Sequence, residues 1–172
     1  GDILGYRSLI SGDTYSASSE TLEETDICFI CVPTPSNSET GQCDTSIVES
    51  VVNELNDVQY KGLICIKSTV EPGTTNKLKT KYPTLRLAMV PEFLRERCAI
   101  TDFTENHDLL VIGTDSQIDF KITKEAHGDL PKEVVKLKPS EAELVKYFNN
   151  CYNATLITFA NAFSEACKIM GV

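Results

Sequence analysis

Three segments of the sequence place polar side chains where they could take part in chemistry. A Lys-Ser-Thr-Val-Glu-Pro-Gly-Thr segment follows an apolar run and offers the hydroxyl groups of Ser68 and Thr69. Glu92 follows a second apolar run, and Lys146 and Asn150 are spaced so that both would project from one face of a helix. Hydroxyl, carboxylate, ammonium and amide groups can bind a polar ligand or exchange hydrogen bonds with it. These residues are therefore the first candidates for a functional site.

Each candidate also has an ordinary structural interpretation. Ser68 and Thr69 could only cap the helix expected after them. Glu92 could be a solvated loop charge, and Lys146 could be an exposed lysine like most others. The residues around any single candidate do not decide between the two interpretations, so both stay open at this point.

The sequence lacks a phosphate-binding loop of either common type. Its nine glycines are scattered, and neither G-x-G-x-x-G nor G-x-x-x-x-G-K-[ST] occurs. Glycine-rich backbone at a helix N-terminus usually holds the pyrophosphate of a dinucleotide. We therefore expect no tight binding of NAD by this chain unaided.

The seven cysteines do not follow the pattern of a disulfide framework. Their odd number and irregular spacing favour a reducing compartment and a cytoplasmic location. Cys28 and Cys31 form a C-x-x-C pair, but it lies in an apolar, strand-like run and not at a helix N-terminus, where redox pairs are activated. His107 and His127 are too isolated to complete a zinc site, so no metal site is predicted. A redox protein using Cys28 and Cys31 is a disfavoured hypothesis.

The composition is that of an ordinary globular protein, with 172 residues of which 41% are hydrophobic and 24% charged. A net charge of −9 argues against a nucleic-acid partner, because phosphate binding requires clustered Lys and Arg. No apolar run reaches the roughly 18–20 residues that cross a bilayer, and the first ten residues do not have the pattern of a signal peptide. We expect neither nucleic acid nor membrane among the partners.

Apolar runs that alternate with helical patterns predict an α/β fold, built on a partial doubly wound, Rossmann-like parallel sheet. Strands are expected over residues 26–32, 63–66, 85–90, 109–112 and 133–137, and helices over 46–56, 72–79 and 115–125. In such a sheet, ligands bind at the carboxyl ends of the strands. Thr34, Ser68, Thr69 and Glu92 all follow strand ends, so strand direction alone would bring them to one edge.

One long helix is predicted for the end of the chain. Ser140 and Glu143 fit a capping box, and neither Pro nor Gly occurs again before Gly171. A helix of about 30 residues would be roughly 45 Å long, which is more than so small a sheet can cover. We expect it to pack against another domain or subunit. The chain thus divides into an α/β part, residues 1–138, and a long helix, residues 139–172.

Four motifs occur in order along the chain. They are Val32-Pro-Thr-Pro35, Lys67-Ser-Thr-Val-x-Pro-Gly-Thr74, Pro91-Glu-Phe-Leu-Arg-Glu96 and Ala142-Glu-x-x-Lys-Tyr-x-x-Asn150. Together they resemble the signatures of the UDP-glucose/GDP-mannose dehydrogenase family, most closely those of its UDP-glucose 6-dehydrogenases. The resemblance covers residues 24–172. It implies that residues 1–138 are the second half of a Rossmann-like NAD-binding domain.

The resemblance implies catalytic roles for four residues. The family oxidises the C6 alcohol of a nucleotide sugar to a carboxylate by two hydride transfers to NAD, through a cysteine-bound intermediate. Glu92 matches the proposed general base for hydrolysis of the thioester, and Thr69 matches a threonine near the reacting water or the cofactor. Lys146 matches a lysine that stabilises developing oxyanion charge, with Asn150 as a neutral donor beside it.

The resemblance also implies binding roles. Phe93, Leu94 and Arg95 match the loop that contacts the nucleotide sugar. Thr34 matches a position in the cofactor cleft, where Ser68 and Thr69 are expected as well. The helix over residues 140–170 matches the family's central helix, which joins two domains and forms the core of a homodimer.

The sequence departs from the family pattern in several places. Arg97 stands where the family usually has Gly, Asn106-His107-Asp108 replaces a Pro-x-Arg element, and Ala162 follows Asn161 where Asn-Glu is common. No cysteine lies in the Gly-Phe-Gly-Gly-x-Cys setting of the family's nucleophile. The leading hypothesis is a portion of an NAD-dependent UDP-sugar 6-dehydrogenase that does not turn over without the missing segments. The alternative is a non-catalytic homologue that acts as a binding or assembly module.

Overall fold

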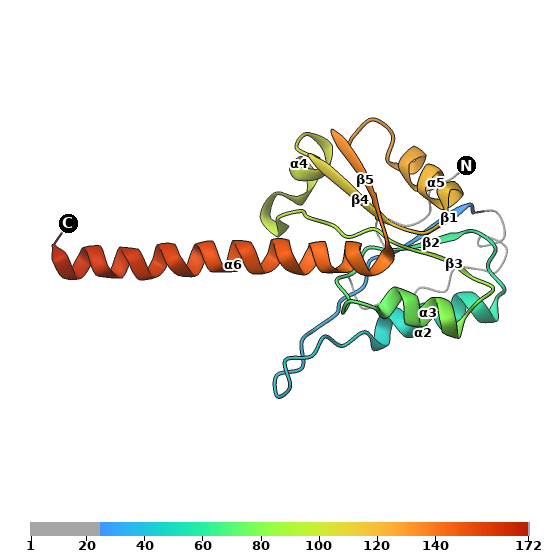
Figure 1. Ribbon diagram of the computed structural model, residues 1–172, viewed down its shortest axis with the longest axis horizontal. Coiled ribbons are helices and arrows are strands. Elements are labelled where there is room, and N and C mark those ends of the chain that lie inside the picture. The colour runs from blue at the N-terminus through green and yellow to red at the C-terminus, as the bar shows by residue number, and fades with distance from the viewer. Residues whose placement is uncertain (1–24, 172) are drawn as a thin grey trace.

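The computed structural model describes residues 25–171, apart from the side chain at position 96 (Figure 1). Expectations for residues 1–24, the start of the predicted α/β part, lie outside this range. Five strands form one sheet in the order β1–β2–β3–β4–β5. They are β1 (Ile27–Ile30), β2 (Leu63–Ile66), β3 (Arg86–Met89), β4 (Leu109–Gly113) and β5 (Glu133–Leu137). Every expected strand is present, and its ends differ from the prediction by at most two residues.

The sheet consists of two parallel groups. β1, β2 and β3 run parallel, with their last residues, Ile30, Ile66 and Met89, side by side. β4 and β5 are parallel to each other. The predicted parallel sheet is confirmed within each group, whereas at the junction β3 and β4 are antiparallel and pair at Met89 and Gly113.

The segment between β3 and β4 gives the physical reason for this junction. It contains a 3-10 turn, η1 (Glu96–Cys98), and a short helix, α4 (Ala99–Thr104). Parallel neighbours need a crossover that returns the chain to the opposite edge of the sheet, usually a full helix. A helix of six residues rises only about 9 Å, so the chain stays near the edge that it has just left.

Helices cover both faces of the sheet, as a doubly wound fold requires (Figure 1). α2 (Ser46–Asp57) and α3 (Thr74–Lys81) lie on one face, and α5 (Gln117–His127) lies on the other. The interior strand β2 is apolar throughout because both of its faces are buried. Ile64 and Ile66 pack toward α2 and α3, whereas Leu63 and Cys65 belong to the cluster under α5.

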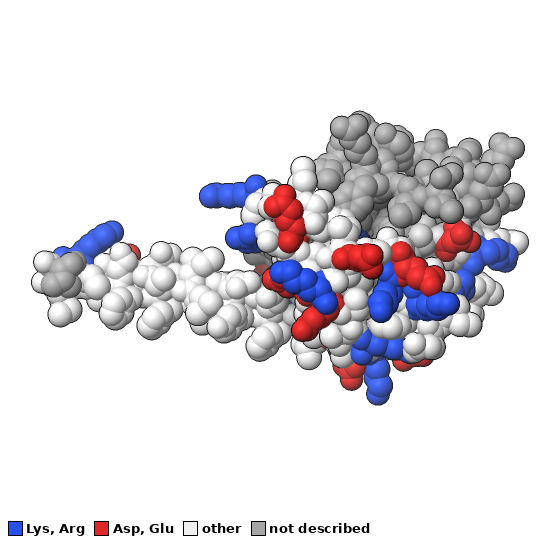
Figure 2. All heavy atoms as spheres, turned by 90° about the horizontal axis from the view of Figure 1, so that it is seen from above, with Lys and Arg blue, Asp and Glu red and all other residues white. Residues whose placement is uncertain are grey.

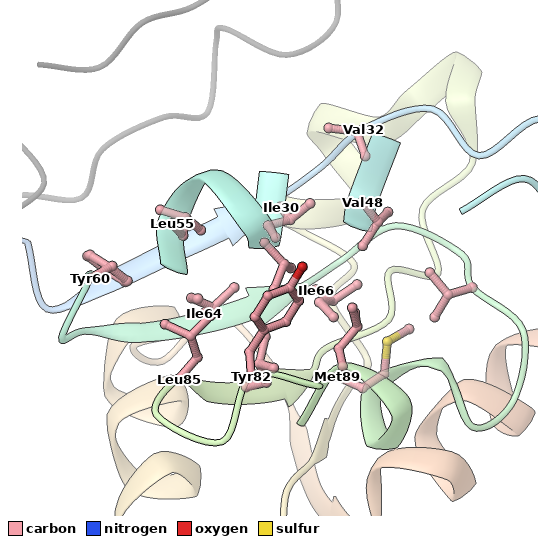
Figure 3. Packing of buried hydrophobic residues seen from close by; sticks show 14 of the residues in the cluster. Ile30, Val32, Val48, Leu55, Tyr60, Ile64, Ile66, Tyr82, Leu85 and Met89 are labelled. Carbon is pink, nitrogen blue, oxygen red and sulfur yellow. The ribbon is translucent and has the colours of Figure 1, made fainter. Parts of the chain in front are cut away.

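The larger core cluster lies between the first three strands and the helices α2 and α3 (Figure 3). Val48, Val52 and Leu55 are spaced so that one face of α2 is buried against Ile30 and Ile64. Full burial of such side chains contributes roughly 1.5–3 kcal/mol each. This packing fixes the loops that leave the strands at their carboxyl ends.

The long helix is α6 (Pro139–Met170), which has 32 residues. Its first turns pack against β4, β3 and α3, while the rest extends away from the body of the molecule (Figure 1). Gly113 permits this close packing. A Cβ atom at that position would lie 2.6 Å from Cβ of Ala142 and 3.0 Å from Cα of Pro139.

The capping box predicted for Ser140 and Glu143 is wrong. The helix begins at Pro139, a residue whose fixed φ suits the first helical position. Glu141 therefore stands three residues after the N-cap Lys138, and its carboxylate accepts a hydrogen bond from the Lys138 amide at 2.8 Å. Glu143 is left free to bond elsewhere.

The extended part of α6 is nearly without charge. No charged residue occurs from Tyr147 to Ser164, and Figure 2 shows this stretch as white atoms between the body and the helix end. Large apolar side chains are exposed along it: Phe148, Tyr152, Leu156, Ile157, Phe159 and Phe163. Within the described residues, no helix combines the length and the apolar character that a membrane span needs.

Candidate active site

The carboxyl edge of the first three strands collects the residues singled out in the sequence. Thr34 lies four residues after the end of β1, Thr69 three after β2 and Glu92 three after β3. Because the three strands end side by side, these residues reach the same edge from segments far apart in the chain. Thr34, Thr69 and Glu92 are all half-buried. The predicted convergence at this edge is therefore present in the structure.

Ser68 has a structural partner at this edge. Its hydroxyl accepts a hydrogen bond from the Val32 amide at 2.8 Å and lies 2.8 Å from the Val32 carbonyl, to which it donates. A hydroxyl has one proton and two lone pairs, so the Ser68 proton is already engaged. The buried Ser68 thus ties the segment after β1 to the segment after β2.

A thiol links the two threonines. The Cys43 thiol lies 3.5 Å from the carbonyl of Thr69 and 3.9 Å from the carbonyl of Thr34. Glu71 accepts a hydrogen bond from the Cys43 amide at 3.2 Å. Tyr147 of α6 also contacts Cys43, and burial raises the pKa of its phenol to about 12. The backbone that carries Thr34 and Thr69 is therefore held by side chains from its own loop and from α6.

Glu92 is held by three different groups. One carboxylate oxygen, Oε1, accepts the amide of Phe93 at 3.0 Å. The other, Oε2, lies 2.9 Å from Nζ of Lys67 in an ion pair. Nζ of Lys146 donates to the backbone carbonyl of Glu92. The Glu92 side chain keeps 21% of its surface exposed, although its Oε2 atom is itself buried.

Lys146 reaches Glu92 across 54 residues of sequence. It projects from the second turn of α6, and its ammonium also lies 5.6 Å from the centre of the Phe93 ring. Burial lowers the pKa of Lys146, and the nearby charge of Glu92 opposes that shift. An ammonium with three protons can hold the Glu92 carbonyl and still donate to a bound oxyanion.

Asn150 lies one turn beyond Lys146 and is exposed. Two other asparagines of α6, Asn149 and Asn153, line a pocket of about 460 Å³ beside the edge. They are also four residues apart, so the same spacing argument that singled out Lys146 and Asn150 could have found them. Asn150 as a donor beside Lys146 stays a prediction.

The predicted substrate loop lines this same pocket. Phe93, Leu94 and Arg95 contribute to its wall together with Glu92, and α6 closes it with Val145, Phe148, Asn149 and Asn153. Asp102, Asn106, His107, Asp108 and Leu109 complete the lining, so most of the residues around this pocket are polar or charged. Residues 93–95 and Glu92 thus line the same pocket.

Arg95 is engaged within the protein. Its guanidinium donates to both carboxylate oxygens of Asp102, at 2.9 and 2.6 Å, and its amide donates to Asp102 at 3.0 Å. This pairing holds the pKa of the Asp102 carboxyl well below its usual range. Arg95 is 74% exposed, so its outer edge stays accessible while Asp102 fixes its position. Asp102 was not found from the sequence because it lies in α4 whereas Arg95 lies in the loop before η1, so no single helix relates the two residues.

Glu143 is a second residue that the sequence interpretation misplaced. It is fully buried, and its carboxylate accepts hydrogen bonds from the Gly73 amide at 2.5 Å, the Thr75 amide at 2.7 Å and the Thr75 hydroxyl at 2.6 Å. These donors form the N-terminus of α3, where the helix dipole favours an anion. These donors at the N-terminus of α3 are therefore satisfied by a carboxylate of the chain itself.

The sequence of this chain matches two profiles of one family. A profile described as "UDP-glucose/GDP-mannose dehydrogenase family, NAD binding domain" matches residues 7–130, and the profile of the family's central domain matches residues 140–172. The chain belongs to the UDP-glucose/GDP-mannose dehydrogenase family. The boundary between the two matches falls beside the start of α6.

Relatives named for different nucleotide sugars are similar to this chain. A UDP-glucose 6-dehydrogenase of Haloferax volcanii is 32% identical over 94% of this chain and 42% of its own length. A GDP-mannose 6-dehydrogenase of Pseudomonas syringae pv. tomato is 31% identical over 89% of this chain and 38% of its own length. The chain thus spans about two fifths of the length of these relatives.

A solved structure shares the fold closely. The UDP-glucose dehydrogenase of Pyrobaculum islandicum matches 92% of this chain and 39% of its own chain, with a TM-score of 0.81 and 31% identity. A GDP-mannose dehydrogenase ternary complex from Pseudomonas aeruginosa matches 90% of this chain and 38% of its own, with a TM-score of 0.78. The α/β fold with its long terminal helix is therefore a fold of this family.

Proposed function

We propose that this chain forms one side of the active site of an NAD-dependent nucleotide-sugar 6-dehydrogenase. The contact between the Lys146 ammonium and the Glu92 carbonyl carries the proposal. It joins two family motifs from distant parts of the chain, next to a pocket lined by the predicted substrate loop. Family membership supports the reaction class.

Each residue has a chemical task in this proposal. Glu92 acts as general base for the water that hydrolyses a thioester of the oxidised sugar, accepting the proton on its carboxylate. Lys146 donates a hydrogen bond to the oxyanion that forms as the water adds, and Asn150 supplies a neutral donor beside it. Preorganised donors of this kind contribute on the order of 3 kcal/mol each. Phe93, Leu94 and Arg95 form the wall against which the sugar nucleotide packs.

The cofactor would bind at the same sheet edge. Each bound NAD would accept one hydride, so two NAD molecules in succession would take up the two, and the half-buried Thr34 and Thr69 are the residues here that would contact the cofactor. Ser68, also predicted there, would act through the backbone, since its hydroxyl is bonded to Val32. The N-terminus of α3 does not fit a pyrophosphate because Glu143 fills it. A pyrophosphate would therefore need binding groups other than the amides at the N-terminus of α3.

The motif resemblance favours UDP-glucose as the substrate over GDP-mannose. Relatives bearing either name are about equally similar to the chain, so the motif strings carry this choice. The chain contains neither a G-x-G-x-x-G loop nor a cysteine in the setting of the family's nucleophile. We therefore propose that residues 1–172 alone yield no NADH from UDP-glucose.

The exposed stripe on α6 supports a homodimer as part of this function. Phe148, Tyr152, Leu156, Phe159 and Phe163 recur at intervals of three or four residues, which places them along one face of the helix. An apolar surface of this extent on a soluble protein marks an interaction site. A second copy of α6, packed along the stripe, would bury it.

The cysteines support a cytoplasmic location. All seven are free thiols, which suits a reducing compartment.

Ligand binding by the chain tests the proposal directly. Thermal unfolding is measured with NAD, UDP-glucose, UDP-glucuronate and GDP-mannose, each against buffer. A rise in melting temperature with the UDP sugars, reduced in Lys146→Met, supports the proposed site. No rise with any ligand contradicts it and favours an assembly module. Turnover by the wild-type chain that Glu92→Gln abolishes would show that residues 1–172 are active alone.

A further inference from the structure

Lys67 is a buried lysine that no part of the proposed reaction uses so far. Its side chain is 5% exposed. Lys67 follows β2 directly and precedes Ser68 and Thr69, whose hydroxyl groups are candidates for the site. Lysine is almost never buried without a partner, because removing an ammonium from water is costly. The partners of Lys67 therefore indicate what it does.

Two acceptors and one aromatic ring surround the Lys67 ammonium. Nζ lies 2.9 Å from Oε2 of Glu92 and 3.5 Å from Nε2 of His127. The ring of Phe29 lies 5.6 Å away, centre to nitrogen. These groups come from β1, from the loop after β3 and from the end of α5, so Lys67 joins three parts of the fold.

The protonation of His127 follows from its second contact. Nδ1 lies 2.8 Å from the carbonyl oxygen of Thr123, which can only accept, so Nδ1 carries a proton. Burial lowers the pKa of His127 to about 4, and the positive charge of Lys67 acts in the same direction. The imidazole is then neutral near pH 7, and its bare Nε2 faces the ammonium of Lys67 as an acceptor.

The other charged and titratable groups around His127 leave this arrangement intact. His107 lies at 6.2 Å between ring centres and, like Lys67, disfavours a positive His127, whereas Glu92 favours it. Burial lowers the pKa of His107 as well. Among the groups facing His127, Lys67 is thus the cation and Glu92 the anion.

With the Lys67 contact, Glu92 is fixed at both carboxylate oxygens. Phe93 holds Oε1 through its amide and Lys67 holds Oε2, while Lys146 holds the backbone carbonyl. Among the described residues, Oε2 has no hydrogen-bond partner besides this ionic contact. Removing Lys67 therefore leaves Oε2 without a partner and the carboxylate held only through Oε1, by the Phe93 amide.

We propose that Lys67 is a positioning residue for Glu92: it holds one carboxylate oxygen, is itself anchored by neutral His127, and so fixes the face that Glu92 turns to the pocket. The inference rests on the proposed function for the role of Glu92, but the arrangement itself can be tested without a substrate. Through Phe93, the same contact also fixes the start of the substrate loop.

Histidine NMR tests the arrangement. In the chain labelled with ¹⁵N-histidine, the ring of His127 is expected as the neutral tautomer with the proton on Nδ1, and His127→Gln identifies its signals. Lys67→Met keeps the length of the side chain and removes the charge, so the midpoint of the His127 titration should move upward. Lys67→Arg keeps a cation and should leave the midpoint low. An unchanged midpoint in Lys67→Met would overturn the inference.

Nucleotide-sugar affinity tests the positioning role. The dissociation constants of UDP-glucose and GDP-mannose are measured by calorimetry for the same variants. Lys67→Met should bind the favoured sugar nucleotide about tenfold more weakly, and Lys67→Arg should restore most of the loss. Lys67→Met combined with Glu92→Gln, which leaves no unpaired buried charge, should bind no more weakly than Glu92→Gln alone. Additive losses would overturn the positioning role.

The two measurements separate the two levels of the proposal. If the wild-type chain binds neither sugar nucleotide, the proposed function fails, while the His127 titration still decides whether the Lys67 ammonium contacts His127. If the sugar nucleotides bind and Lys67→Met changes the titration but not the affinity, the positioning role is wrong and the proposed function stands.

Discussion

Both the amide and the hydroxyl of Thr75 donate to one carboxylate oxygen of Glu143, at 2.7 and 2.6 Å. This pair joins the first turn of α3 to the first turns of α6 across 68 residues of sequence. Lys146 follows Glu143 by one helical turn, so the pair also sets where the Lys146 ammonium emerges. The buried carboxylate of Glu143 thus fixes the position of α6 relative to α3 and the sheet edge.

Glu143→Gln should destabilise the protein by about 2–3 kcal/mol, because an amide group would face donors that the carboxylate now satisfies. The free energy of unfolding is measured by urea denaturation. Glu141→Gln is the matched control, since Glu141 is exposed and accepts a single amide. Its loss should be about 1 kcal/mol or less. Equal losses for the two variants would contradict the role of Glu143.

Gly113→Ala should push α6 away from β4. The added Cβ would lie 2.6 Å from Cβ of Ala142, and neither Pro139 nor the helix backbone can move cheaply. Overpacking of this kind costs about 1–3 kcal/mol, measured as a drop in the free energy of unfolding. Adding Ala142→Gly removes the nearest clash and should recover part of the loss. A double variant no more stable than Gly113→Ala would show that the contact with Ala142 is not the cause.

Acid should destabilise the protein through His127. The pKa of His127 is about 4 in the folded state and 6.5 when unperturbed. Between pH 6.5 and pH 4, His127 is therefore protonated in the unfolded chain and neutral in the folded chain. The contribution to stability is complete above pH 6.5 and falls as the pH drops toward 4, by at most about 3 kcal/mol. Unfolding measured at pH 7 and pH 4.5 should therefore show a smaller pH dependence in His127→Gln. An identical dependence would contradict the assignment of the neutral state.

A charge in the apolar stripe of α6 should break the proposed dimer. Phe159→Asp places a carboxylate on the exposed stripe, where Phe159 also stacks on Phe163 with 6.1 Å between ring centres. Analytical ultracentrifugation should show a dimer for the wild type and a monomer for this variant. Asn161→Asp adds the same charge nearly opposite on the helix and should leave the dimer intact. A monomeric wild type at all concentrations would refute the dimer.

The sequence allowed the position of much of the site to be predicted because strand direction decides it. Once the runs before Thr69 and Glu92 are recognised as parallel strands, their carboxyl ends must meet at one edge. The i,i+4 spacing of Lys146 and Asn150 likewise follows from helix geometry. These are local patterns with a single geometric outcome.

The remaining contacts depend on tertiary packing, which a local pattern does not contain. Ser140 and Glu143 fit a capping box, but the buried amides of α3 bind Glu143 more favourably than the exposed start of its own helix. No sequence pattern singles out Lys67, because its partners Glu92 and His127 lie 25 and 60 residues further along the chain. Long-range pairs of this kind leave no periodic signal in the sequence.

The uncovered length of α6 also bears on how much of the protein a cell can maintain. A copy whose stripe stays exposed presents the apolar surface that chaperones retain and proteases remove. In the proposed dimer, its abundance would therefore depend on the concentration at which two copies of α6 pair. Pairing of the proposed kind would then determine how much of the protein persists as well as its assembled form.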